Sequence, residues 1–124
     1  MKLTAELTAK LQAKNCQVQH DALTASEIAA LLPAIPAWQL DGHYIVRSFR
    51  FKNYYETIAF VNALANVVHA QDHHPVLTVT FDWCIVKFNT HSVNQGAGGL
   101  SENDFICAAK LDALLPHLRH LPPQ

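Results

Sequence analysis

Hydrophobic and polar positions repeat along the chain with two periods, and the changes between them predict the order of the elements. Near the start, leucines recur at helical spacing and predict a short first helix: Leu3, Leu7 and Leu11. Polar residues 15–21 follow and should be irregular. Thr24 and Glu27 then form a capping box, in which each side chain binds the other residue's backbone amide. They begin a second helix that should weaken around Pro33.

The middle of the chain predicts a β-hairpin followed by a long helix. The hairpin covers residues 38–51, because Asp41-Gly42 is a favoured two-residue turn. Apolar residues on its second strand share one face, interrupted by Arg47: Ile45, Phe49 and Phe51. Asn53 and Glu56 resemble a second capping box. The helix they begin should run to about Gln71, with this apolar stripe: Ile58, Val61, Leu64, Ala65 and Val68.

The second half predicts another hairpin, a glycine-containing loop and a last helix. Apolar and threonine residues alternate over residues 77–81, and the chain should turn near Asp82. The partner strand covers residues 84–90, and residues 91–100 should form a loop. A third capping box then begins a helix that ends at Pro116, with Ser101 and Asp104 as its two members.

This order, α-β-β-α-β-β-α, predicts an α+β fold. Two hairpins separated by a helix give a four-stranded antiparallel sheet with helices packed on one face. Nothing in the pattern closes the sheet, so its edge strands could pair between subunits. We expect a domain over residues 23–116, preceded by a partly helical N-terminal extension, residues 1–22, and followed by a tail, residues 117–124.

Composition narrows the classes of function. The net charge is −1 with histidine neutral, which argues against non-specific binding to nucleic acid. Half of the residues are hydrophobic and only 15% are charged, so a compact domain that associates with copies of itself is expected. The three cysteines are widely spaced and lack a C-x-x-C pair, as is ordinary in a reducing compartment. No apolar stretch has the length of a signal peptide or a membrane span, and we expect a cytoplasmic protein.

Histidine is the one residue type in excess, with eight copies. His73 and His74 end the long helix, and His91 follows the last predicted strand. If the last two strands form a hairpin, these three residues converge at one end of the sheet. Imidazole exchanges protons near neutral pH, so the group is a candidate acid–base site that needs no metal.

Several histidines fit structural roles instead. His69 could simply complement the negative end of the helix dipole. Asp104 could be only a capping residue. Four more we take as surface or structural residues: His20, His43, His117 and His120. A metal site is the competing hypothesis, since four histidines could supply zinc ligands: His69, His73, His74 and His91. The H-E-x-x-H signature is absent, however.

At these residues the chain resembles the pterin-4a-carbinolamine dehydratases, small α+β proteins also known as dimerisation cofactors of a homeodomain transcription factor. The resemblance rests on Asp72-His73-His74-Pro75, the aromatic Phe81, Thr90-His91, and Leu100-Ser101-Glu102-x-Asp104. It extends upstream through Phe49-Arg50-Phe51-Lys52-Asn53-Tyr54 and Leu31-Leu32-Pro33, so that it covers about residues 23–115.

The resemblance implies dehydration of 4a-hydroxytetrahydropterin to quinonoid dihydropterin, the recycling step after aromatic amino-acid hydroxylation. It makes His73 and His91 the acid–base residues and lets His74 bind and orient the pterin. Phe81, Thr90 and Asp104 would help to bind the substrate, and Asp104 could orient a histidine. No cofactor or metal is implied, and the expected partners are the pterin, further copies of the chain as a homodimer or homotetramer, and an aromatic amino-acid hydroxylase in the pathway.

Three departures from the family pattern stand beside the resemblance. His69 takes the place of an acidic residue, Leu77 that of an aromatic residue, and the loop over residues 92–99 is longer. That loop could form a lid, or it could indicate a different substrate. Two alternatives to the enzyme therefore stay open: a non-catalytic binding or regulatory module of the same fold, and a histidine-ligated metal protein.

Overall fold

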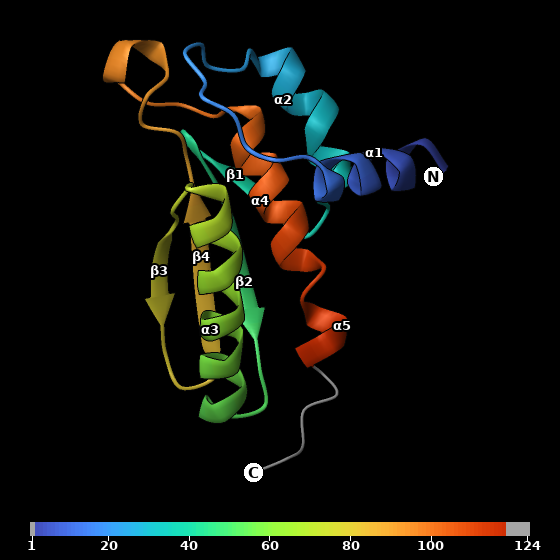
Figure 1. The fold of residues 1–124 in the computed structure, drawn as a ribbon, viewed down its shortest axis with the longest axis vertical. Coiled ribbons are helices and arrows are strands. Elements are labelled where there is room, and N and C mark those ends of the chain that lie inside the picture. Colours follow the sequence, from blue (N-terminus) through green and yellow to red (C-terminus); the bar gives the residue numbers. More distant parts are fainter. Residues whose placement is uncertain (1, 119–124) are drawn as a thin grey trace.

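A computed structural model of the protein describes residues 2–118. One four-stranded antiparallel sheet lies under a layer of helices (Figure 1). The helices are α1 (Lys2–Ala13), α2 (Ala25–Leu31), α3 (Tyr54–Gln71), α4 (Glu102–Asp112) and α5 (Leu115–Leu118), with short 3-10 turns η1 (Leu32–Ala34) and η2 (Asn94–Gly96). The strands are β1 (Gln39–Asp41), β2 (Tyr44–Arg50), β3 (Val76–Val79) and β4 (Trp83–Phe88), in the order β1-β2-β4-β3. The predicted α+β class is confirmed.

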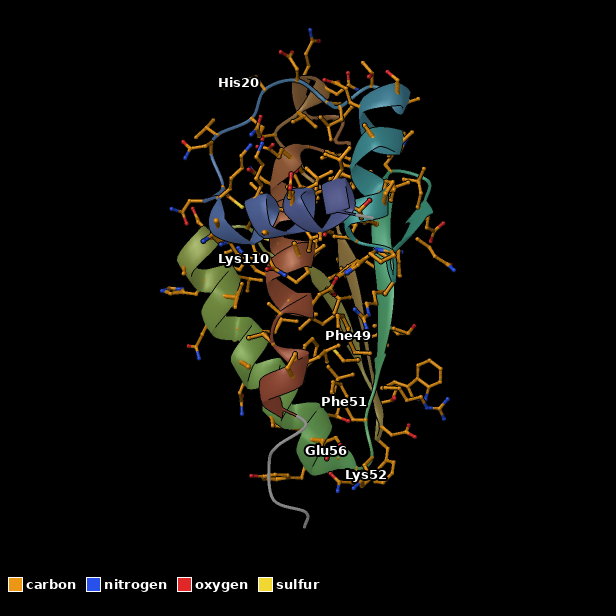
Figure 2. All side chains as sticks on the ribbon, turned by 90° about the vertical axis from the view of Figure 1, so that its right-hand side faces the viewer. His20, Phe49, Phe51, Lys52, Glu56 and Lys110 are labelled. Atoms are coloured by element: carbon orange, nitrogen blue, oxygen red, sulfur yellow. The ribbon has the colours of Figure 1, made fainter. Side chains whose placement is uncertain are left out.

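The helices lie on one side of the sheet, with α3 and α4 next to it and α1 crossing over α4 (Figure 2). Alternate residues of β4 are buried on that side: Cys84, Val86 and Phe88. Three fully buried phenylalanines on other elements complete the centre of the core: Phe49, Phe60 and Phe105. In the part of the chain described, no helix combines the length and apolar character that crossing a membrane requires.

Two of the predicted capping boxes form as expected. The Thr24 hydroxyl accepts the amide of Glu27, whose side chain binds the Thr24 amide, and the same reciprocal pair joins Ser101 and Asp104. The third is only half formed. Asn53 accepts the amide of Glu56, but the Glu56 carboxylate turns to the amide of Lys52 instead.

Several predicted boundaries were wrong by a few residues. Asp41 pairs with Tyr44 in the sheet, so the first turn consists of Gly42 and His43, with Gly42 taking the positive φ of 60°. Strand β3 ends at Val79 because the Thr80 amide already donates to the Trp83 carbonyl and closes the turn. The last helix ends at Asp112, and the chain resumes helical form in α5.

The buried face of α3 also differs from the predicted stripe. The core receives Thr57, Phe60, Leu64 and Val68, whereas Ala65 is exposed. Phe60 takes the place expected of the aliphatic residues because its ring packs between those of Phe49 and Phe51.

Arg47, which interrupts the apolar face of β2, is held by specific contacts. Its guanidinium lies 4.3 Å from the centre of the Phe49 ring and donates to Asp112 at 2.6 Å. The indole N–H of Trp38 donates to the same carboxylate oxygen at 2.9 Å. Because both donors satisfy Asp112, a charged pair is tolerated at the edge of the core.

Candidate active site

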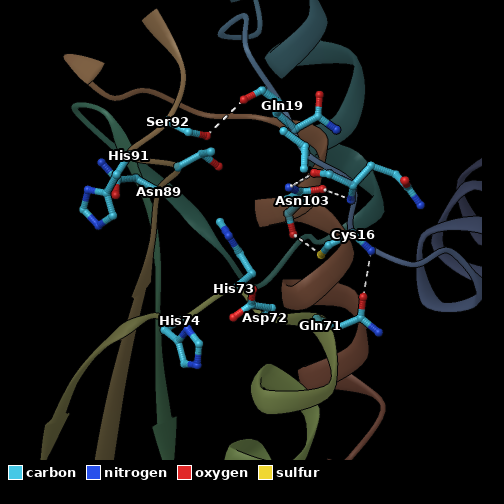
Figure 3. A pocket seen from close by; sticks show the side chains of 13 residues that line it. Cys16, Gln19, Gln71, Asp72, His73, His74, Asn89, His91, Ser92 and Asn103 are labelled. Carbon is cyan, nitrogen blue, oxygen red and sulfur yellow. Dashed lines mark hydrogen bonds between the residues drawn. The ribbon is translucent and has the colours of Figure 1, made fainter. Parts of the chain in front are cut away.

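A cavity of about 530 Å³ opens where α3 ends, β4 ends and α4 begins. Three of its lining residues are the histidines singled out in the sequence, His73, His74 and His91. The full lining consists of Cys16, Gln17, Val18, Gln19, Gln71, Asp72, His73, His74, Asn89, Thr90, His91, Ser92 and Asn103. Figure 3 shows the three histidines across the cavity from Cys16, Gln19 and Asn103.

His73 reaches this cavity because α3 ends abruptly before it. Asp72 adopts the left-handed conformation, with φ 50° and ψ 44°, which aspartate tolerates better than most residues. The amides of Asp72 and His73 then both bind the Val68 carbonyl, which closes the helix. The turn directs the His73 side chain inward, where its ring lies parallel to that of Phe88, with the centres 5.8 Å apart.

A buried carboxylate fixes the His73 ring. Nε2 of His73 and Oδ1 of Asp104 are 2.6 Å apart, and Asp104 is fully buried in the first turn of α4. Its other oxygen accepts the Thr90 hydroxyl and the Ser101 amide, each at 2.9 Å. Because both carboxylate oxygens are bound, Asp104 is tolerated without solvent and cannot turn away from His73.

A short hydrogen-bond relay holds the acceptor side of this pair. Thr90 is fixed by a bridge to Gly99, where each residue's amide binds the other's carbonyl. Since the Thr90 hydroxyl donates to Asp104, it accepts the hydroxyl of Ser101 at 2.7 Å. Thr90 therefore contributes to the site mainly by holding Asp104.

The balance of two opposing effects sets the proton affinity of His73. Burial lowers the pKa of the imidazole, but the hydrogen bond and the negative charge of Asp104 together outweigh it, so the pKa lies above its usual value near 6.5. With Nε2 engaged by Asp104, Nδ1 is the ring nitrogen left to exchange a proton with a bound molecule. His73 is thus built as a proton-transfer group.

This raised pKa makes a prediction about stability. Protonated His73 stabilises the fold fully below about pH 6.5, and this contribution is lost as the pH rises through the raised folded-state value. We expect the difference in unfolding free energy between wild type and His73→Gln to shrink between about pH 5.5 and pH 8.5. Glutamine keeps an N–H donor without a titratable charge, and urea unfolding at several pH values measures the difference. A difference independent of pH would contradict the raised pKa.

The remaining predicted residues divide into two groups. His74 and His91 line the cavity and are exposed to solvent. Phe81 does not line it: this residue lies in the turn between β3 and β4, at the far end of the hairpin, and is 63% exposed. His69 is exposed on the last turn of α3, outside the lining. Of the long loop, only Ser92 lines the cavity.

Four histidines were assigned to the surface or to structural roles. His20 and His43 are exposed and lie outside the cavity lining. His120 and the side chain of His117 lie outside the residues described. Among the described residues, no three histidine, cysteine, aspartate or glutamate side chains are arranged to hold a metal ion. The metal hypothesis therefore has no ligand set in this part of the chain.

The sequence gave no signal for one further contact at the site. Cys16 and Cys107 lie 91 positions apart, yet their sulfur atoms are 3.6 Å apart. The hydrogen bond from Cys107 lowers the pKa of the Cys16 thiol, against the effect of burial, and the nearby His73 lowers it further. The same hydrogen bond and burial raise the pKa of Cys107.

Comparison with known proteins identifies the family. The sequence pattern described as pterin 4 alpha carbinolamine dehydratase matches residues 21–114. The chain belongs to the pterin-4a-carbinolamine dehydratase family. This family is one of hydro-lyases, and the conserved architecture agrees with the resemblance inferred from the histidine motif.

Individual relatives cover most of the chain. A Bdellovibrio bacteriovorus protein assigned by name to the pterin-4-alpha-carbinolamine dehydratases is 57% identical over 105 residues, which are 85% of this chain and 88% of the relative. A Nitrosospira multiformis protein with the same name is 46% identical over 114 residues, 92% of this chain and 97% of the relative.

The fold is also found in a solved structure. The crystal structure of a transcriptional coactivator/pterin dehydratase from Brucella melitensis matches with a TM-score of 0.69 and 33% identity. The match covers 98% of the Brucella chain but 76% of this one. This chain therefore carries residues beyond those needed for the shared fold.

Proposed function

We propose that the protein catalyses the dehydration of 4a-hydroxytetrahydropterin to quinonoid dihydropterin, in the recycling of tetrahydropterin after aromatic amino-acid hydroxylation. The observation that carries the proposal is the His73–Asp104 pair, which lies on a cavity shared with His74 and His91. Membership of a hydro-lyase family supports the reaction class. The cavity lining contains no lysine or arginine, which suits a neutral heterocycle better than a polyanion.

The reaction needs two proton transfers and no change of oxidation state. The bond between C4a and the hydroxyl oxygen breaks, a proton is added to that oxygen, and water leaves. The neighbouring ring nitrogen loses its proton, and its electron pair forms the new C=N bond. We assign these transfers to His73, acting through Nδ1, and to His91, with His74 orienting the pterin. General acid–base catalysis by positioned imidazoles accounts for about 10²–10⁴-fold per group.

Asp104 has a defined part in this scheme. It holds the Nε2–H tautomer of His73 and stabilises the imidazolium that forms when Nδ1 takes up a proton. The carboxylate does not touch the substrate, because it is fully buried behind the histidine. Asp104 is therefore a positioning residue.

The direct test is an assay in which an aromatic amino-acid hydroxylase generates the carbinolamine. We expect the wild-type protein to accelerate its dehydration and His91→Ala to lower kcat by about 10²-fold. His74→Ala should mainly raise KM, since an orienting residue contributes binding. His43→Ala is the matched control, because His43 is an exposed histidine outside the cavity. An inactive wild type, or a His91→Ala variant with wild-type kcat, would overturn the proposal and leave the binding-module alternative.

We further propose that the chain self-associates, as expected from its low charge. Strand β3 is at the edge of the sheet, and apolar side chains at or near it are exposed: Val76, Val79 and Phe81. Exposed apolar residues beside an unpaired strand favour pairing with a second copy. Sedimentation velocity distinguishes a monomer from a dimer or tetramer.

A further inference from the structure

The N-terminal arm, residues 14–20, lies outside the region matched by the family pattern, which begins at residue 21. It nevertheless supplies four of the residues that line the histidine cavity: Cys16, Gln17, Val18 and Gln19. The arm is not peculiar to this chain, since the match to the Nitrosospira relative covers 92% of the sequence and must reach residue 11 or earlier. This wall of the cavity is an addition to the family domain.

One side chain holds the arm as a neighbouring strand would. The Asn103 amide accepts the backbone N–H of Gln17 at 3.0 Å and donates to the Gln17 carbonyl at 2.6 Å. Asn103 is only 6% exposed, so both ends of its amide depend on the arm for their hydrogen bonds. Leaving a buried amide unsatisfied costs about 1–3 kcal/mol, which favours the closed arrangement.

Contacts on both sides of Asn103 keep the arm over the cavity. The Cys16 amide donates to Gln71 at 2.7 Å, and Ser92 donates to the Gln19 carbonyl at 3.0 Å (Figure 3). The amide of Asn94 binds the carbonyl of His20. The arm thus joins the end of α3, the start of α4 and the loop after β4, the same three segments that carry the catalytic candidates.

The arm is anchored upstream as well. Helix α1 packs across α4 with Leu11 buried, and Lys110 donates to the Gln12 carbonyl at 2.6 Å. Lys14 pairs with Glu102 at 2.8 Å, although both groups are exposed and such a pair contributes little. Because the arm is fixed at both ends, residues 16–19 are presented to the cavity in one conformation.

We propose that residues 16–19 of the N-terminal arm form part of the pterin-binding site, and that Asn103 is the positioning residue that holds them there. This inference rests on the proposed function for its substrate. The arm sets the affinity for the pterin, whereas the His73–Asp104 pair, on the opposite wall, sets the chemical rate. A substrate bound beside the histidines is covered by the arm, so the arm's displacement weakens binding before it affects proton transfer.

The kinetic test compares Asn103→Ala with Asn66→Ala, a change at an exposed asparagine of α3 outside the cavity. Asn103→Ala removes two hydrogen bonds to Gln17, so we expect KM to rise about tenfold, the equivalent of two net bonds of about 1 kcal/mol less partial compensation. The value of kcat should change less than threefold, and Asn66→Ala should match the wild type. An Asn103→Ala variant with unchanged KM, or with a loss confined to kcat, would overturn the inference.

A second measurement does not depend on activity or on a variant that might not fold. Cys16 lines the cavity, while Cys84 and Cys107 are buried, so iodoacetamide should alkylate Cys16 first. Saturating biopterin, a stable pterin, should slow this alkylation at least fivefold, as followed by mass spectrometry. Biopterin that binds, by fluorescence, without protecting Cys16 would contradict the inference. If the wild type lacks dehydratase activity but biopterin protects Cys16, the proposed reaction fails and the arm's role in binding stands.

Discussion

Asp104→Asn is expected to lower kcat/KM for dehydration by about 10²-fold or more at neutral pH. The substitution is nearly isosteric, so Thr90 and Ser101 keep a partner on this side chain. Toward His73, however, a carboxylate that accepts from Nε2 is replaced by an amide whose NH₂ can face the ring. The imidazole then loses both its charge partner and its fixed tautomer.

The same variant should change the dependence of the rate on pH. In the wild type, Asp104 raises the pKa of His73 against the effect of burial. In Asp104→Asn only burial remains, so the pKa of His73 falls and the acidic limb of kcat/KM moves to lower pH. Thermal unfolding of both proteins controls for loss of the fold. A variant with wild-type kcat/KM, or an acidic limb that moves to higher pH, would contradict the role assigned to Asp104.

Phe88→Ala should lower the unfolding free energy by about 3–5 kcal/mol, the range for truncating a buried phenylalanine. Phe88 is fully buried on the helix-facing side of β4, where its ring contacts that of Trp38, with centres 5.8 Å apart, and lies parallel to His73. The substitution leaves a cavity between the core and the active site. Urea unfolding at pH 7 measures the loss.

Phe88→Leu is the matched control for this prediction. Leucine fills most of the same space, so its cost should stay below about 2 kcal/mol. Because the Phe88 ring also supports His73, the alanine variant should lose activity at temperatures where it remains folded. A cost below about 1 kcal/mol for Phe88→Ala would show that the core and site are not joined through this residue.

Local patterns predicted most of the fold. The capping boxes at Thr24 and Ser101 depend only on residues three positions apart, and both form as expected. The histidines at the cavity were also accessible to prediction, because a hairpin brings the segment before β3 beside the segment after β4. Errors arose where tertiary contacts decide. Strand β3 ends early at a backbone bond from Thr80 to Trp83, which leaves Phe81 in the turn.

Long-range features of the site left no trace in local pattern. Asn103 looked like an ordinary residue in the first turn of a helix, yet its side chain pairs with the backbone of Gln17, 86 positions away. The contact between Cys16 and Cys107 likewise depends on α1 packing across α4. No periodicity encodes such contacts, because they result from how the extension folds onto the domain.

The central claim is that His73 and Asp104 act as one proton-transfer unit in pterin dehydration. A double-mutant cycle tests it most directly, with the dehydration rate measured for wild type, His73→Ala, Asp104→Asn and the double variant. We predict that the wild type accelerates dehydration and that the double variant is no slower than His73→Ala alone, because Asp104 acts only through His73. Losses that multiply in the double variant, or a wild type that does not accelerate the reaction, would contradict the account.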